Sequence, residues 1–130
     1  MRRRLMIFSS VLAAAFALAG QPARADQKFI VFFPEWSAEL DHAAHDVVAA
    51  AAAYAKRNPA MQVDVTGFAS TSGGQKANMY LSLLRAQRIS DLLGEAGVAA
   101  ARLSRVGEGS VSSVGTAEEA RRVEVVVRAP

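Results

Sequence analysis

The stretch that decides the fold is MQVDVTGFASTSGGQKANMYLSLLRA, residues 61–86. Residues 61–66 alternate between apolar and polar side chains, which predicts a half-buried strand. Gly67 and a turn of small residues follow this strand. Residues 75–96 then repeat apolar side chains at helical spacing, and Gly97 suits the position just after a helix. The stretch therefore predicts a strand, a tight turn and a long helix.

A similar unit is expected upstream. Residues 29–33 are a continuous apolar run that ends at Pro34, which predicts a buried first strand. Residues 40–55 then place apolar side chains at helical spacing. Ser37 is the expected N-cap of this first helix, and Pro59 marks its end because proline cannot continue a helix.

Downstream, two more strands are expected. Residues 102–106 predict a weak strand, residues 107–116 a loop rich in glycine and serine, and residues 123–128 a strong closing strand. The element order is then β-α-β-α-β-β. This order predicts one α/β domain, an α+β sandwich in which both helices pack on one face of a mixed sheet.

Residues 1–25 have the composition of an export signal. A cationic start of three arginines precedes a short apolar run and the segment Ala23-Arg24-Ala25, so cleavage near Ala25 is expected. The mature domain, residues 26–130, would then reach the periplasm, where it could associate with the cell wall or outer membrane. A cut after Ala19 and an uncleaved anchor are the alternatives. The apolar run is short for a membrane span, which needs about 20 residues.

Charge and cysteine content exclude several classes of protein. Four of the fifteen basic residues and none of the twelve acidic residues lie in residues 1–25, so eleven basic and twelve acidic residues remain, a net charge of −1. This balance argues against a nucleic-acid partner. The absence of cysteine excludes disulfides, thiolate zinc sites and an N-terminal lipid on cysteine. His42 and His45 lack an evident third ligand, so no metal or cofactor is expected.

The quoted stretch resembles the core motif of the OmpA-like C-terminal family. That motif runs Gly-His-Thr/Ala-Asp, a small residue, Gly, then Tyr-Asn, Leu-Ser and Arg-Ala. The matching residues here are Gly67, Ala69, Ser70, Gly73, Asn78, Leu81, Ser82, Arg85 and Ala86. Further matches, in the family's order, are Phe33, Ser37, Ala38 and Leu40 upstream, and Gly107, Glu108, Gly109, Arg121, Arg122, Val123 and Glu124 downstream.

The resemblance implies a non-enzymatic module that holds peptidoglycan without covalent bonds, by clasping the diaminopimelate of its stem peptide. It assigns to Arg85 the pairing with a ligand carboxylate. The expected ligand-binding residues are Ser70, Thr71, Asn78, Arg85 and Arg122. Ser70 stands where the family has an aspartate that receives an ammonium or amide donor. Losing one charge-assisted hydrogen bond weakens binding by about 1.5–3 kcal/mol.

Side-chain chemistry supports Arg85 independently. Its planar guanidinium matches a carboxylate in two parallel hydrogen bonds. Asn78, Ser82 and Arg85 stand at positions i, i+4 and i+7 and therefore share one stripe of the helix. The alternative is that Arg85 pairs with an acidic residue of the protein itself, such as Asp64 or Glu108.

Three questions stay open at the level of sequence. Glu35 is a hypothetical source of the negative charge that Ser70 lacks. Arg121 and Arg122 should face opposite sides because they are neighbours on a strand. Trp36 is either a wall of the ligand groove or a cover over the first helix. The alternative function is a domain of the same fold whose ligand site has decayed and which contacts another envelope protein.

Overall fold

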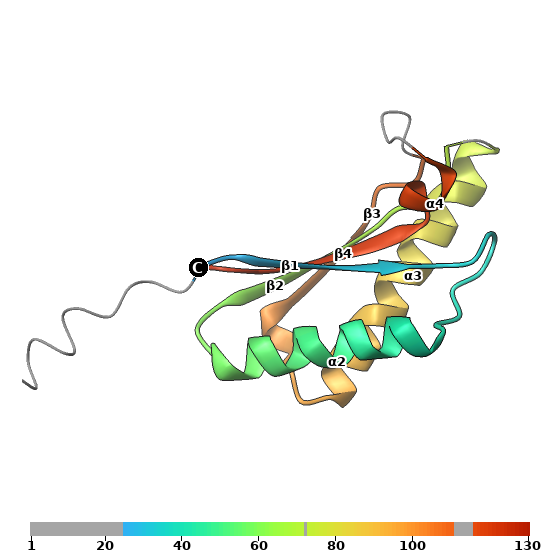
Figure 1. The fold of residues 1–130 in the computed structure, drawn as a ribbon. Helices are drawn as coiled ribbons and strands as arrows, with labels where there is room; N and C mark the ends of the chain where they lie inside the picture. Colours follow the sequence, from blue (N-terminus) through green and yellow to red (C-terminus); the bar gives the residue numbers. More distant parts are fainter. Residues whose placement is uncertain (1–24, 72, 111–115) are drawn as a thin grey trace, which may run out of the picture.

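The computed structural model describes residues 25–71, 73–110 and 116–130. Nearly all of the predicted export signal, residues 1–24, and the middle of the predicted loop, residues 111–115, lie outside the described residues. The elements in chain order are β1 (Gln27–Phe32), α2 (His42–Arg57), β2 (Gln62–Gly67), α3 (Gln75–Glu95), η1 (Ala100–Arg102), β3 (Leu103–Gly107), α4 (Ala117–Ala120) and β4 (Arg122–Arg128) (Figure 1).

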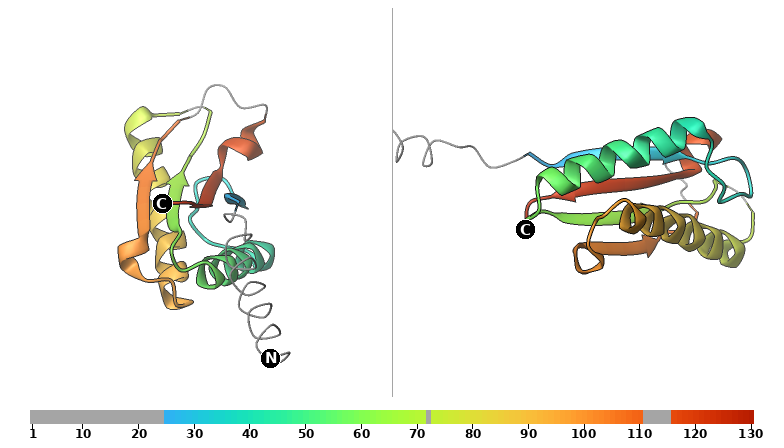
Figure 2. Two further views of the ribbon diagram at one scale, coloured as in Figure 1. Left: turned by 90° about the vertical axis from the view of Figure 1, so that its left-hand side faces the viewer. Right: turned by 90° about the horizontal axis from the view of Figure 1, so that it is seen from below.

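The strands form one mixed sheet in the order β1-β4-β2-β3. β2 and β3 are parallel, and β4 is antiparallel to both β1 and β2. The two long helices lie side by side on the same face of this sheet (Figure 2). The predicted fold class and element order are thus confirmed, and the short helix α4 is an addition that the sequence did not predict.

Alternate residues of the strands build the core. The register of β2 and β4 places Val65 opposite Val125 and Val63 opposite Val127, and all four side chains are buried. Ile89 of α3 packs on this layer. α2 contributes mainly small side chains, which let the helix lie close to the strands; these are Ala44, Val48, Ala51, Ala52 and Ala55.

β1 differs from its prediction as a buried strand. It lies at the edge of the sheet and pairs only with β4. Val31 faces the helices and is buried, whereas Ile30 and Phe32 point to the other face and are 38% and 42% exposed. The apolar run was therefore a misleading signal, because among the described residues no helix covers that second face of the sheet.

The start of α2 also differs from the prediction. Its N-cap is Asp41, whose Oδ1 accepts a hydrogen bond from the Ala44 backbone N–H at 2.8 Å. Ser37 instead accepts from the Glu39 backbone N–H, outside the helix. The carbonyl of Ser37 is bound by Arg85 at 2.8 Å, which holds this part of the chain in a loop. The helix consequently begins one turn later than Ser37 indicates.

The other predicted elements agree closely with the structure. α3 begins at Gln75 as expected, and Gly97 follows it with φ = 107°, a left-handed conformation that suits glycine. β3 and β4 coincide with the two predicted downstream strands to within a residue. In the described ranges, no helix combines the length and the apolar character that a membrane crossing needs.

Candidate functional site

Three loops leave the same end of the sheet, and Arg85 binds two of them. The loops join β1 to α2, β2 to α3 and β3 to α4 (Figure 1). The Arg85 side chain, which has no exposed surface, projects from α3 into this loop end. Its guanidinium donates to backbone carbonyls of the first two loops, with Nε to Ser37 at 2.8 Å, Nη1 to Phe68 at 3.1 Å and Ala69 at 2.9 Å, and Nη2 to Pro34 at 2.9 Å.

The charge of Arg85 has no acidic partner among the described residues. Asp64 pairs with Arg128 instead, so the alternative that Arg85 pairs with Asp64 is wrong. No ion pair joins Arg85 to Glu108 either. Burial lowers the pKa of Arg85 to about 10, and repulsion from the nearby Arg121 adds to this shift. At neutral pH the group is a buried cation. Among the described residues, carbonyl dipoles and the face of the Phe33 ring, whose centroid is 5.3 Å from Arg85 Cζ, offset its charge.

The rest of the predicted polar stripe on α3 also binds protein groups. Asn78 is fully buried, and its Nδ2 donates to Ser110 Oγ at 2.8 Å. Ser82 Oγ accepts from the Gly109 backbone N–H at 2.9 Å and donates to the Met79 carbonyl. Asn78, Ser82 and Arg85 do share one face of the helix. That face ties the three loops to α3.

A small pocket opens among these loops. It has a volume of about 50 Å³. A pocket of this size has room for the end group of a ligand but not for a whole peptide. The residues that line it are Glu35, Trp36, Ala69, Ser70, Thr71, Leu81, Ala117 and Arg121.

Two of the five predicted ligand residues, Ser70 and Thr71, line this pocket. Arg85 and Asn78 do not; Arg85 lies behind Ala69, whose carbonyl it binds. Arg122 points to the opposite face of the sheet, where its guanidinium lies 4.1 Å from the Phe68 ring centroid and its Nε 2.9 Å from Glu124 Oε2.

Arg121 takes the place at the pocket that we expected for Arg122. Its Nε donates to the Phe33 carbonyl at 3.1 Å, which fixes the side chain beside the β1–α2 loop. The sequence predicted that the two arginines face opposite ways, and they do. Which of them faces the pocket depends on the register of β1 with β4, in which Phe32 lies opposite Arg122. No local sequence signal reports that register.

Glu35 and Trp36, from the β1–α2 loop, also line the pocket. The Glu35 carboxylate has no hydrogen bond or ion pair with a described residue, and it is the only acidic side chain of the lining. Trp36 has φ = 52°, a strained value for a residue with a side chain. Its ring packs towards Gly73, where an added Cβ would lie 3.4 Å from the ring. Trp36 is therefore a wall of the pocket and not a cover over α2.

The described lining of the pocket offers polar and charged groups that can bind a ligand. These groups are one carboxylate, one guanidinium, two hydroxyls and an indole, and the lining includes neither histidine nor cysteine. His42 Nε2 lies 3.9 Å from Asp46 Oδ2 on the exposed side of α2. Nowhere in the described residues do three or more histidine, cysteine or acidic side chains gather as metal ligands would.

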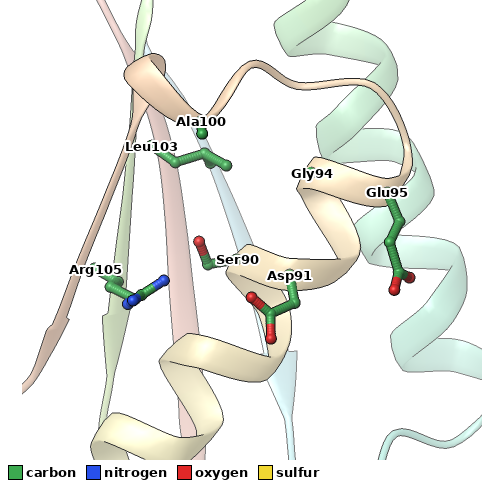
Figure 3. Close-up of a pocket in the computed structure, with 7 residues that line it drawn as sticks. All are labelled: Ser90, Asp91, Gly94, Glu95, Ala100, Leu103 and Arg105. Atoms are coloured by element: carbon green, nitrogen blue, oxygen red, sulfur yellow. The ribbon is translucent and has the colours of Figure 1, made fainter.

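A larger hollow lies at the other end of α3. It has a volume of about 600 Å³ and separates the last turns of α3 from β3 (Figure 3). Figure 3 shows Ser90 and Asp91 on the helix facing Arg105 on the strand. The hollow is shallow, and no ion pair joins its acids to Arg105. Its chemistry does not single out a ligand.

Comparisons with known proteins agree on one family. The model of the OmpA family matches residues 32–125. The crystal structure of the peptidoglycan-associated lipoprotein from Burkholderia pseudomallei superimposes with a TM-score of 0.71 at 22% identity, covering 77% of this chain and 90% of that one. The cell wall anchor of the T6SS from Pseudomonas aeruginosa gives 0.67 at 25% identity, covering 90% and 94%.

A third solved structure is similar to the same extent. The OmpA-like domain of FopA1 from Francisella tularensis subsp. tularensis SCHU S4 gives a TM-score of 0.69 at 22% identity, covering 85% of this chain and 78% of that one. No protein with a curated description matches the sequence.

Proposed function

The chain belongs to the OmpA family, and we propose that it is a non-enzymatic module of the cell envelope that binds peptidoglycan without covalent bonds. The observation that carries this proposal is the small polar pocket at the loop end, lined by Ser70 and Thr71 at the motif positions of the family and by the charged pair Glu35 and Arg121. Two of the similar structures bear names that refer to peptidoglycan or the cell wall, which supports the same function.

The ligand end group is proposed to be the zwitterionic head of the diaminopimelate in the stem peptide. Its carboxylate binds the Arg121 guanidinium and the hydroxyl of Thr71. Its ammonium binds Glu35, which takes the part that an aspartate at position 70 would play. A guanidinium and a carboxylate in one pocket lining match the two charges of such a head group.

Arg85 is proposed to act as a positioning residue. Four of its five N–H donors already bind carbonyls of Pro34, Ser37, Phe68 and Ala69. These carbonyls belong to the loops that carry Glu35, Trp36 and Ser70. Arg85 therefore holds the β1–α2 and β2–α3 loops together around the pocket, and its buried charge makes the pocket more attractive to an anion.

We also propose that the protein works in the periplasm, after cleavage of residues 1–25. The described domain is anchored from its first residues: Asp26 Oδ1 accepts from the Ala129 backbone N–H at 2.9 Å, and the Tyr54 hydroxyl donates to the Ala25 carbonyl at 2.7 Å. N-terminal sequencing of the exported protein tests this boundary. A mature chain that begins at Asp26 supports it, and a chain that still begins at Met1 contradicts it.

A sacculus pull-down tests the binding function. Wild-type protein is expected to sediment with isolated peptidoglycan and to be released by free diaminopimelate. Arg121→Gln should weaken binding by a factor of about ten to a hundred, because it removes a charge-assisted contact. Arg105→Gln makes the same change at the larger hollow and should bind as wild type does. Ser70→Asp should tighten binding, because it restores a negative charge.

The same experiment separates this proposal from its alternative. The alternative is a domain of the same fold whose ligand site has decayed and which contacts another envelope protein. The small volume of the pocket and the complete burial of Arg85 are the observations that favour this alternative. Wild-type protein that stays in the supernatant at every peptidoglycan concentration rejects the peptidoglycan-binding function and supports that alternative. Equal binding by Arg121→Gln and wild type would keep the function and reject this pocket.

A further inference from the structure

The outer side of α3 exposes large apolar side chains. Tyr80, Leu83 and Leu84 are 70%, 44% and 38% exposed, and they point away from the sheet. A hollow of about 250 Å³ runs along them. Its lining residues are Tyr80, Leu83, Leu84, Gln87, Arg88 and Asp91. Their spacing of i, i+3, i+4, i+7, i+8 and i+11 is that of a single helical stripe. We call these residues, together with Lys76 one turn earlier, the outer stripe.

The charges of the outer stripe oppose the dipole of α3. The first turn of the helix has no acidic residue and carries Lys76, and the last turn has no basic residue and carries Glu95, one turn after Asp91. Cations at the positive N-terminus and anions at the negative C-terminus of a helix are destabilising. None of Lys76, Asp91 and Glu95 forms an ion pair with a described residue. Arg88 lies one turn before Asp91 and offsets this arrangement in part, but no ion pair between described residues joins the two.

The α3 helix of a second copy, lying alongside in the opposite direction, would bring an opposite charge to each end of the first. We propose that two copies of this chain associate through their outer stripes, antiparallel, about a two-fold axis between Leu83 and Leu84. In this register Leu83 lies against the partner's Leu84. Tyr80 lies against the partner's Gln87, and Lys76 lies against the partner's Asp91. The positive end of each helix then adjoins the negative end of the other.

A parallel pairing would have the opposite effect. It would place Lys76 beside the partner's Lys76 and Asp91 beside the partner's Asp91, so that both ends repel. The charge pattern thus selects one orientation as well as one partner. A symmetric contact of this kind uses the same patch on both copies and closes at two, so it gives a dimer and not a filament.

The size of the patch predicts a weak dimer. The outer stripe spans about 22 Å of helix between Lys76 and Asp91, at about 1.5 Å per residue. One helix against another buries less surface than a standard stable interface of about 1,600 Å². The outer stripe shares no residue with the pocket at the loop end. A dimer would therefore carry two accessible pockets, and a peptidoglycan mesh would retain it more strongly than a single copy.

Sedimentation of the protein purified from cells that express the full sequence tests the proposal. Between about 10 μM and about 1 mM the wild type should shift from monomer to dimer. Lys76→Asp and Asp91→Lys, made singly, place like charges together at both ends and should each raise the dissociation constant about ten-fold or more. The double variant Lys76→Asp/Asp91→Lys restores opposite charges and should dimerise again. Asp46→Lys, the same change on the exposed side of α2, is the control.

Each outcome decides the proposal. Recovery in the double variant excludes misfolding as the cause of the single effects and supports the antiparallel pairing. A wild type that remains monomeric across the whole range overturns the proposal. The proposal is also overturned if the single variants leave the dissociation constant of the dimer unchanged, or if the double variant does not dimerise. Because the readout is mass and not peptidoglycan binding, its failure is independent of the function proposed for the pocket.

Discussion

The two ends of α3 meet the sheet in opposite ways. At the loop end the helix touches the strands so closely that a Cβ added to Gly67 would lie 2.0 Å from the Ser82 carbonyl oxygen, and one added to Gly107 would lie 2.7 Å from Ser82 Oγ. At the other end nothing lies within 4 Å of a Cβ added to Gly94, and the hollow of about 600 Å³ opens beside it.

This difference shows why the hollow of about 600 Å³ is not the candidate site. The wide hollow lies where the helix diverges from β3 and few side chains interact across the gap (Figure 3). The small pocket lies where buried polar groups of α3 hold three loops in place. A binding site needs side chains held in fixed positions, and only the tight end provides them.

Alanine in place of glycine at each end is the strongest test of this contrast. Gly67→Ala pushes a methyl group into the backbone of α3, which cannot move aside without opening the core, so we expect a loss of about 3 kcal/mol or more in the free energy of unfolding. Gly94→Ala meets nothing and removes a flexible residue from a helix, so we expect a gain of about 0.5–1 kcal/mol. Urea unfolding of both variants measures these changes.

The opposite signs make this test decisive. If both variants lose stability by similar amounts, the close approach at Gly67 is not specific to the loop end. If neither changes stability, α3 can shift along the sheet, and its position does not fix the pocket.

The sequence predicted each element but not the distance between them. The alternation in residues 61–66 and the helical spacing after Gln75 are local, and both β2 and α3 appeared where expected. Gly67 was interpreted as part of a turn. Its main role depends on Ser82, which only the packing of the helix on the strand brings within reach.

The candidate site was harder to predict for the same reason. Arg85 was expected to face a ligand, but the Pro34 and Ser37 carbonyls that bind it come from a loop about fifty positions earlier in the chain. Arg121 was passed over for Arg122 because the pairing of β1 with β4 decides which of them faces the pocket. Motif spacing identified Ser70 as a site position. Spacing alone does not report which groups have found partners within the protein.

Arg85 and Arg102 lie at opposite ends of the sheet, and replacing each of them by methionine gives the next test. Arg102, at the end remote from the pocket, also binds only carbonyls: Met61 at 3.0 Å, Ala55 at 2.8 Å and Asn58 at 2.9 Å. It is partly exposed and lies at the C-terminus of α2, where a cation is favoured. We expect Arg102→Met to cost about 1–2 kcal/mol, because water can replace the lost donors.

Arg85→Met should cost about 3 kcal/mol or more, because four carbonyls inside the loop end lose their donor where water enters poorly. Circular dichroism during urea unfolding compares the two variants. Proteolysis should also cut the β1–α2 loop faster in Arg85→Met than in Arg102→Met. A smaller loss for Arg85→Met than for Arg102→Met would show that desolvation of the guanidinium outweighs its hydrogen bonds, and that loop positioning is not its role.

The smallest effect is expected on the uncovered face of the sheet, away from both ends of α3. Burial raises the pKa of Asp64, but hydrogen bonds from Arg128 and Ser104 outweigh burial, and the net shift is downward. A carboxyl group whose pKa falls on folding stabilises the protein above its unfolded pKa of about 4, and the effect disappears as the pH falls through the folded value. Wild type should therefore be slightly more stable than Asp64→Asn at pH 7, and the two should converge below about pH 3.

Salt distinguishes this charge effect from packing. Asp64 and Arg128 are partly exposed, so a high salt concentration should shrink the difference at pH 7. The same salt should leave the losses at Gly67 and Arg85 unchanged, because steric overlap and buried hydrogen bonds are not screened. If the difference in stability between Asp64→Asn and wild type persists at low pH and high salt, packing and not charge stabilises the uncovered face, as it does the loop end. The contrast between the two regions would then be one of degree.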